Sequence, residues 1–296
     1  MLYAAGAYSL WGFLPVFFLL LAPSGPFEIV SVRIFFSLVF CALILTVTRS
    51  WAKFVGILRQ PRLAFTMALA GALIYVNWQT YVIATLTGHV IEAALGYFIN
   101  PIVTILLGVL LLRERLRLMQ WVALGISVLA VGVLTAGYGS VPWISLILAF
   151  SFGLYGLIKK RVGPRVDAVS GLTLETLWLT PVAAIQIFIV AGSTGLTFGS
   201  SGGWHIVLMM SAGIITAVPL LLFAGAARRL PLVYLGFFQY LAPFLQLIFG
   251  VFILNEPMPP ERWVGFGLVW VSLVILTVDL VAAYRTPVTP AKHPVG

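Results

Sequence analysis

Ten apolar runs follow one another along the chain, and this pattern constrains the fold more than any other feature. A helix rises about 1.5 Å per residue, so about 20 residues cross the hydrocarbon core of a bilayer. The runs cover residues 2–22, 28–48, 63–83, 90–112, 119–137, 142–158, 169–190, 204–226, 232–254 and 263–283. The sixth is the shortest. We therefore predict an all-α membrane protein with ten transmembrane helices.

Composition favours the same class. The chain is 61% hydrophobic and 8% charged, whereas soluble proteins carry about 25% charged residues. A net charge of +9 would suggest nucleic-acid binding in a soluble protein. Here the basic residues lie in short clusters between apolar runs, where membrane topology explains them. We expect the lipid bilayer to be a partner of this chain, and nucleic acid not to be one.

The basic residues also predict an orientation. Of 17 Lys and Arg, 15 lie in alternate gaps between the runs or in the tail, and the intervening gaps hold only Arg262. Basic loops stay in the cytoplasm, so both termini are expected inside. The number of spans must then be even, as ten is.

The two halves of the chain resemble each other at an offset of 142 residues. The aligned pairs include Arg33 with Glu175, Gly71 with Gly213, Pro101 with Pro243, Gly108 with Gly250, Glu114 with Glu256 and Trp121 with Trp263. Five is an odd number of spans, so the second copy would enter the membrane from the opposite side, as in alternating-access transporters. We expect a first five-helix repeat over 1–140, an inverted second repeat over 141–286 and a cytoplasmic tail over 287–296. The alternative is a chance similarity between apolar segments.

Three ionisable residues, Arg33, Glu92 and Glu175, lie far from the loops. A charge at bilayer depth costs at least about 2.5–3.5 kcal/mol, so each should face the protein interior and have a partner. Arg33 and Glu92 are both expected in the outer third of the membrane and are predicted to pair. Glu175 is expected in the inner third, near Tyr234 or the basic loop after the eighth run. These residues either serve coupling, with a glutamate carrying a proton, or form an ion pair that only stabilises packing.

Polar and aromatic side chains recur too deep in the runs to belong to an interfacial belt. Aromatic rings and a few amides suit a cavity for a small amphipathic or aromatic substrate. The candidate substrate-binding residues are Trp11, Asn77, Trp78, Tyr81, Tyr97, Asn100, Tyr155, Trp178, Phe238 and Gln239.

Two prolines at equivalent positions of the halves are candidate hinges. Pro101, next to Asn100, removes one backbone hydrogen bond and is predicted to kink the helix over 90–112 in its middle. Pro243 lies at the matching position of the second half. Prolines are common in membrane helices generally, so an ordinary structural role is the alternative.

Motifs for other chemistry are absent from the sequence. It contains no GxxxxGK[ST] phosphate loop and no HExxH, CxxC or GxSxG motif. The three histidines have no spacing typical of a metal site. We therefore expect no enzymatic activity, no cofactor and no metal.

Nearly the whole chain resembles the RarD branch of the drug/metabolite transporter superfamily, whose members carry EamA domains. The segments that carry the resemblance are NWQTYV, IEAALGYFINPIVTILLGVLLLRERLRLMQW, ETLWLTPVAAI and TAVPLLLFAGAARRLPLVYLGFFQYLAPFLQLIFGV. The resemblance implies ten spans in two five-helix inverted repeats, the bacterial inner membrane and transport of small molecules. Related members export amino acids or metabolites, which suggests a central cavity between the repeats.

These features together predict a secondary transporter, of the exporting kind, for small organic metabolites or drug-like solutes. It would work by alternating access, with proton coupling left open, as a monomer or homodimer in the bacterial inner membrane. The alternative is a membrane receptor or assembly protein that does not transport. Such a protein would be expected to have a soluble extension or a long structured loop, but the longest outer gap, 191–203, is rich in glycine and serine.

Overall fold

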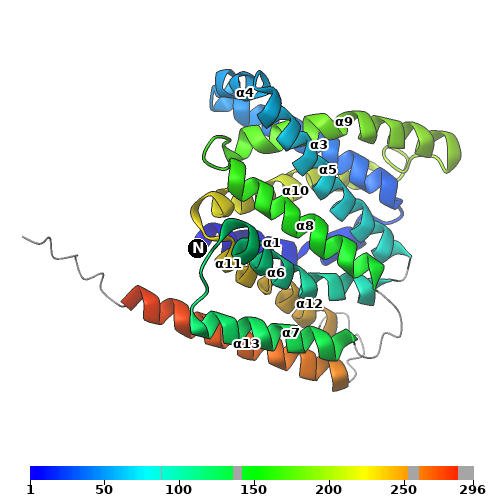
Figure 1. Ribbon diagram of the computed structural model, residues 1–296. Helices are drawn as coiled ribbons and strands as arrows, with labels where there is room; N and C mark the ends of the chain where they lie inside the picture. Colours follow the sequence, from blue (N-terminus) through cyan, green and yellow to red (C-terminus); the bar gives the residue numbers. More distant parts are fainter. Residues whose placement is uncertain (88, 136–141, 253–259, 286–296) are drawn as a thin grey trace, which may run out of the picture. The chain divides into compact units, whose positions relative to one another are not determined.

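The computed structural model describes residues 1–87, 89–135, 142–252 and 260–285, and all regular elements in these ranges are helices (Figure 1). The helices are α1 (Leu2–Gly12), α2 (Leu14–Leu19), α3 (Pro26–Val47), α4 (Trp51–Leu58), α5 (Pro61–Leu86), α6 (Val90–Leu112), α7 (Leu118–Thr135), α8 (Trp143–Val162), α9 (Ala168–Ser193), α10 (Gly203–Arg229), α11 (Leu232–Phe238), α12 (Leu241–Phe252) and α13 (Pro260–Arg285).

Local chemistry explains several helix boundaries. Pro26 and Pro61 begin α3 and α5. Proline suits a first turn because the N–H that it lacks would have no partner within the helix. Asp167 caps α9, since its side chain accepts a hydrogen bond from Ser170 N at 3.0 Å. Arg113 ends α6 in a left-handed conformation, with φ of 55°.

The helices follow the predicted apolar runs. Six of them, α3, α5, α6, α8, α9 and α10, are long and apolar enough to cross a membrane by length and composition, and shorter apolar helices accompany them. The chain is therefore a multi-pass membrane protein. Two runs differ from the prediction, because the first is divided into α1 and α2 and the ninth into α11 and α12. The short helix α4 lies in a basic loop.

The run 90–112 forms one helix across Pro101, and the kink expected there stays a prediction. Helix α6 continues from Val90 to Leu112 with Pro101 inside it, and α11 packs closely there: a Cβ on Gly236 would lie 3.0 Å from the Pro101 carbonyl oxygen. The helix ends instead lie just before Pro15 and Pro243, which fall in the first turns of α2 and α12. A first turn accommodates proline without losing a hydrogen bond.

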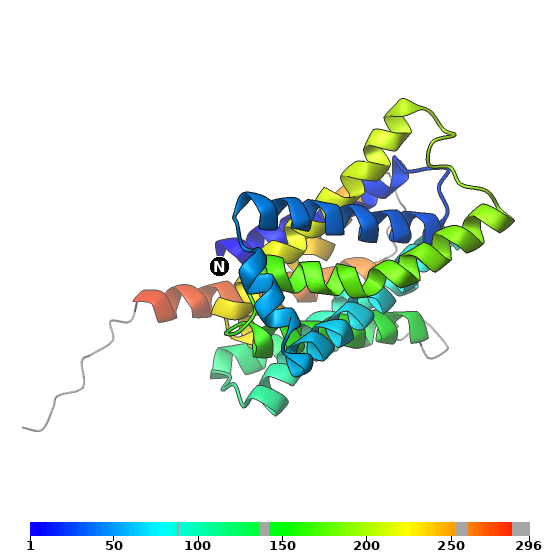
Figure 2. The same cartoon turned by 90° about the horizontal axis from the view of Figure 1, so that it is seen from above.

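The chain divides into two compact units. Unit 1 comprises Met1–Glu114 and Tyr138–Pro257, and unit 2 comprises Arg115–Gly137 and Met258–Gly296. This division by contacts differs from a division at residue 140, because unit 1 takes helices from both halves of the chain. Within unit 1, α3 packs against α9 and α10 (Figure 2), α8 against α5 and α6, α1 against α10 and α12, and α6 against α11.

Unit 2 consists of α7 and α13 side by side. Polar contacts join them at two levels. Ser127 Oγ lies 2.9 Å from Ser272 Oγ, and near one end Gln120 Nε2 donates to Asp279 Oδ2 at 3.0 Å. Asp279 also forms an ion pair with Arg117, at 3.5 Å. Buried polar side chains of this pair are thus satisfied by each other, as a membrane interior requires.

Candidate functional site

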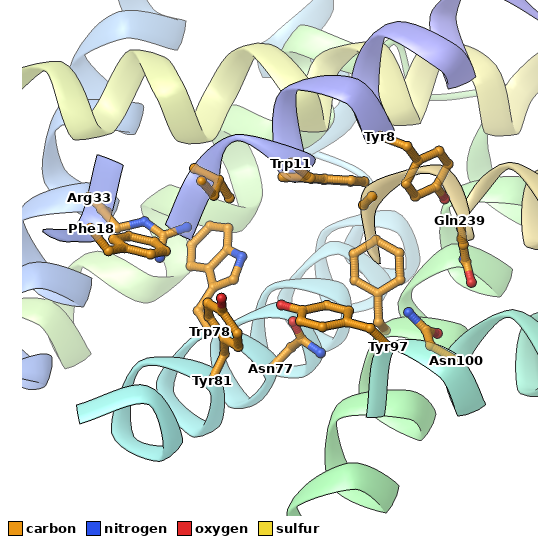
Figure 3. A pocket seen from close by; sticks show the side chains of 13 residues that line it. Tyr8, Trp11, Phe18, Arg33, Asn77, Trp78, Tyr81, Tyr97, Asn100 and Gln239 are labelled. Atoms are coloured by element: carbon orange, nitrogen blue, oxygen red, sulfur yellow. The ribbon is translucent and has the colours of Figure 1, made fainter. Parts of the chain in front are cut away.

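A pocket opens inside unit 1 among side chains from both halves of the chain (Figure 3). It is lined by Tyr8, Trp11, Leu14, Phe18, Arg33, Asn77, Trp78, Tyr81, Tyr97, Asn100, Phe152, Gln239 and Ala242. Arg33 is the charged member, and no carboxylate is among the described residues that line the pocket. The wall is therefore aromatic, with one cation and several neutral hydrogen-bonding groups.

Arg33, from α3, lies at one end of the pocket beside Phe18 (Figure 3). Its side chain is 3% exposed. The guanidinium carbon lies 5.1 Å from the centre of the Phe18 ring and 5.0 Å from that of Trp78, within cation–π range. Arg33 Nε donates to Thr216 Oγ1 at 2.8 Å. The two rings and this hydroxyl hold the guanidinium in place.

The other end of the pocket is neutral and polar, with Tyr8, Asn100 and Gln239 (Figure 3). Gln239 follows the last residue of α11, where the chain passes into α12. Its side chain hydrogen-bonds Thr104 Oγ1 on α6, at 3.1 Å from Nε2. The Tyr8 hydroxyl is buried and lies beside the Gln239 side chain. This end can therefore exchange hydrogen bonds with a bound molecule.

Between the two ends lie aromatic rings and Asn77. Tyr81 and Tyr97 meet edge to face, with ring centres 5.4 Å apart. Asn77 Nδ2 donates to Leu148 O at 2.9 Å and to Ser151 Oγ at 3.1 Å, which fastens α5 to α8 beside the pocket. These contacts fix the rings and the amide before any ligand arrives.

An aromatic cluster closes one wall of the pocket. Trp11 and Phe152 line the pocket and meet edge to face at 5.4 Å. Behind them, Tyr155 and Phe223 are fully buried and stacked, with centres 5.7 Å apart and planes 17° apart. Phe223 also contacts Phe152 at 5.2 Å and Trp11 at 5.8 Å. The cluster joins α1, α8 and α10.

A buried ion pair lies beyond this cluster. Lys159 Nζ is 2.6 Å from Glu175 Oε1, and Tyr155 Oη donates to Glu175 Oε2 at 3.1 Å. The predicted meeting of Glu175 with Tyr234 or the basic loop after the eighth run is therefore wrong. The sequence does not reveal this partner, because Lys159 follows the run 142–158 and resembles a residue of the basic loop. Helix α8 continues to Val162 and turns this lysine toward α9.

Glu92 has a different role from the one predicted. Its Oε1 accepts a hydrogen bond from Ile144 N at 2.8 Å, and its carbonyl oxygen accepts one from the Ser145 hydroxyl. Because Ile144 lies in the first turn of α8, Glu92 satisfies a helix N-terminus. Among the described residues there is no Arg33–Glu92 ion pair. The two side chains serve different neighbours, the pocket rings and the start of α8.

The structure brings together seven of the ten predicted binding residues. Those that line the pocket are Trp11, Asn77, Trp78, Tyr81, Tyr97, Asn100 and Gln239. Tyr155 lies behind the wall, and Phe238 is half-buried against the hydrophobic core. Trp178 is 48% exposed on α9 and lies outside the pocket. Phe18 and Phe152 were not predicted, because a phenylalanine in an apolar run gives no sign of its direction.

Among the described residues of unit 1, the buried carboxylates of Glu28, Glu92 and Glu175 accept backbone hydrogen bonds or form an ion pair. Within the described ranges, no three His, Cys, Asp or Glu side chains gather as metal ligands would. The pocket wall has the residue types that bind small organic molecules in proteins, namely apolar and aromatic surface with a few fixed polar groups. The chemistry of the pocket wall therefore suits the binding of a small organic molecule.

Comparison with known proteins agrees with the resemblance seen in the sequence. The EamA-like transporter family matches residues 1–136 and again 140–278. The protein RarD of Streptomyces exfoliatus is 45% identical over 306 residues, covering 99% of this chain and 96% of the relative. RarD of Escherichia coli K12 is 39% identical over 284 residues, covering 96% and 95%. The uncharacterized transporter YojE of Bacillus subtilis is 38% identical over 279 residues, covering 93% and 92%.

A solved crystal structure shares the fold. It superposes with a TM-score of 0.71 at 18% identity and covers 94% of this chain and 98% of its own. At that identity the likeness shows the fold alone. The family and the names of the relatives indicate transport rather than catalysis. The predicted RarD resemblance is confirmed, and the chain belongs to the EamA-like transporter family.

Proposed function

We propose that this chain is a secondary transporter that binds a small organic solute in the pocket of unit 1 and moves it across the bacterial inner membrane by alternating access. The observation that carries the proposal is the pocket itself, where a buried cation, amides and rings gather inside a bundle of membrane helices. Polar side chains at this depth need a partner or an aqueous cavity.

Ten spans in two inverted repeats, 1–140 and 141–286, would explain how the helices pack. In this proposal α1 with α2 forms one span and α11 with α12 another. Exchanging the repeats replaces α1 by α8, α3 by α9, α5 by α10, α6 by α11–α12 and α7 by α13. Under this exchange, the contact between α3 and α10 corresponds to the contact between α9 and α5. The contact between α1 and α10 corresponds to the contact between α8 and α5. Both members of each pair are present, which supports a pseudo-twofold axis.

Two glycines support the same relation. Gly71 and Gly213 are 142 residues apart in the sequence. A Cβ on Gly71 of α5 would lie 3.1 Å from Glu175 O on α9, and one on Gly213 of α10 would overlap the backbone of Phe36 on α3. Equivalent glycines thus permit close helix crossings at equivalent interfaces.

Alternating access requires one side of the pocket to close while the other opens. In the predicted orientation, with both termini cytoplasmic, Lys159 and Glu175 belong to the inner side, so their ion pair and the aromatic cluster would form the inner gate. Rocking of the repeats about hinges at Pro101, inside α6, and Pro243, in the first turn of α12, would separate them. Protonation of Glu175 would neutralise one partner of the gate and so couple opening to protons.

Reconstitution tests this function. Purified protein in proteoliposomes should take up some members of a labelled metabolite panel, measured with and without a pH gradient. Trp78→Ala and Asn100→Ala should lower uptake under both conditions. Glu175→Gln should abolish gradient-driven uptake while exchange between equal pools continues, and that exchange shows that the variant is folded.

Trp178→Ala is the matched control, because it removes an indole that lies outside the pocket. It should transport like the unchanged protein. Uptake no greater than that of empty liposomes across the panel would remove the transport proposal. Unaltered uptake in both pocket variants would place the substrate elsewhere.

A further inference from the structure

Arg33 is a buried charge whose countercharge is not supplied by the described part of the chain. Lys159, which is also deeply buried, has a carboxylate at 2.6 Å. Arg33 is buried to a similar degree, yet its described neighbours are two aromatic rings and a hydroxyl. Burying a charge without an opposite charge is costly, and cation–π contacts offset only part of that cost. An anion entering the pocket would supply what is missing.

The geometry of the guanidinium narrows the kind of anion. Arginine has five N–H donors, and Nε uses one of them on Thr216. Neither Nη1 nor Nη2 has a hydrogen-bond partner among the described residues, although Arg33 lines the pocket. Two guanidinium nitrogens side by side fit the two oxygens of a carboxylate in a planar pair. A phosphate dianion would call for more positive charge than the single described cation of this wall.

The other residues that line the pocket indicate what the rest of the bound solute is like. Beyond Arg33 come the rings of Trp78, Tyr97 and Trp11, which suit a planar apolar body. At the far end lie the buried Tyr8 hydroxyl and the amides of Asn100 and Gln239 (Figure 3). They can hydrogen-bond a neutral polar group, and an apolar tip would leave them unsatisfied.

We propose that the solute is a small aromatic carboxylate, with its carboxylate held by Arg33, its ring between the aromatic side chains and a neutral polar group toward Gln239. This rests on the proposed function, in which the pocket is the substrate site. Thr216 acts as a positioning residue, because its hydroxyl fixes Nε and so turns the other two nitrogens toward the pocket.

Matched pairs of probes test the charge requirement in the unchanged protein. Phenylacetate and phenylacetamide share one ring and differ in charge, as do indole-3-acetate and indole-3-acetamide. Calorimetric titration of the purified protein should give tighter binding of the carboxylate in each pair, by about tenfold, as expected for a charge-assisted pair in a buried site. Equal binding, tighter binding of the amides, or binding of none of the four would overturn the inference.

Variants then place the charge at Arg33. Arg33→Gln should lower carboxylate affinity by about tenfold and leave amide affinity within about twofold. Arg33→Lys should restore part of the preference, since it keeps the charge but not the planar pair. The control is Arg229→Gln, which also removes a cation over a ring, 4.9 Å from Tyr3 and outside the pocket. Carboxylate binding that survives Arg33→Gln unchanged would also overturn the inference.

This result is separable from the transport result. One outcome is uptake from the metabolite panel that depends on Trp78 and Asn100, while carboxylates bind no better than amides. That result would contradict the inference of an anionic solute and would still support transport. If the pocket variants alter neither uptake nor binding, the pocket is not the substrate site.

Discussion

Lys159 Nζ lies 2.6 Å from Glu175 Oε1 between α8 and α9, with the two side chains 4% and 0% exposed. Tyr155 completes the arrangement through its hydroxyl, and its ring stacks on Phe223, which contacts the pocket-lining Phe152. The pair therefore links the contact between α8 and α9 to the aromatic wall of the pocket. In such a buried pair the attraction balances the loss of hydration only while both partners are present.

Removing one partner of this pair should cost more than removing both. Glu175→Leu leaves a buried ammonium group and should lower the free energy of unfolding by about 3–5 kcal/mol, whereas Lys159→Met with Glu175→Leu should recover much of the loss. Unfolding in mixed detergent micelles, followed by circular dichroism, measures both. Arg117→Gln is the control, because Arg117 is 43% exposed and Asp279, its 7% exposed partner, keeps the hydrogen bond from Gln120, so the loss should be at most about 1 kcal/mol. A loss in the double variant equal to the sum of the losses from Lys159→Met and Glu175→Leu alone would show that the charges do not depend on each other.

Arg33 and Glu92 should behave as independent residues. Their hydrogen-bond partners, Thr216 and Ile144, are different. The losses from Arg33→Gln and Glu92→Ala should therefore add within about 0.5 kcal/mol in a double-mutant cycle of unfolding free energies. Glu92→Gln should cost less than Glu92→Ala, because an amide oxygen can still accept from Ile144 N. A coupling above about 1 kcal/mol would restore the ion pair that the sequence suggested.

The loss of unfolding free energy on replacing a glycine by alanine should be larger where the structure leaves less room for the added Cβ. Gly213→Ala places a Cβ 2.7 Å from Phe36 O, and should lower the free energy of unfolding by about 1–3 kcal/mol through overpacking of α3 and α10. Gly71→Ala, at 3.1 Å from Glu175 O, should cost less. Gly56→Ala meets nothing within 4 Å in α4 and should be neutral or stabilising by at most about 1 kcal/mol. The same detergent unfolding assay compares all three, and a loss at Gly56 equal to that at Gly213 would contradict the ranking.

Much of the fold could be predicted because membrane helices are recognised in a sequence by their length and apolar composition. The polar side chains of the pocket could also be predicted, since Asn77, Asn100 and Gln239 lie too deep in apolar runs to face lipid. Polar side chains at this depth must all face the interior of the helix bundle. The sequence cannot give the direction of an apolar ring, so Phe18 and Phe152 were missed.

Partners of buried charges were harder to predict, because they depend on where a helix ends and how it is rotated. Lys159 looks like a loop residue until α8 is seen to continue to Val162. Glu28 is 1% exposed, and it holds the chain after α9 by accepting from Thr197 N and from Phe198 N, at 2.9 and 2.7 Å. Contacts across 169 residues of sequence leave no periodic signal.

Accessibility of single cysteines should decide the orientation of the chain. The asymmetry of basic residues predicts cytoplasmic loops around Lys53, Arg115 and Lys160, and an outer loop around Ser200. In a background with Cys41→Ala, Lys53→Cys, Arg115→Cys and Lys160→Cys should be shielded from an impermeant thiol reagent in intact cells and react after the membrane is opened. Ser200→Cys should react in both, since Ser200 is exposed between α9 and α10. Labelling of Arg115→Cys in intact cells with protection of Ser200→Cys would invert the topology, and would move the Lys159–Glu175 gate to the outer side.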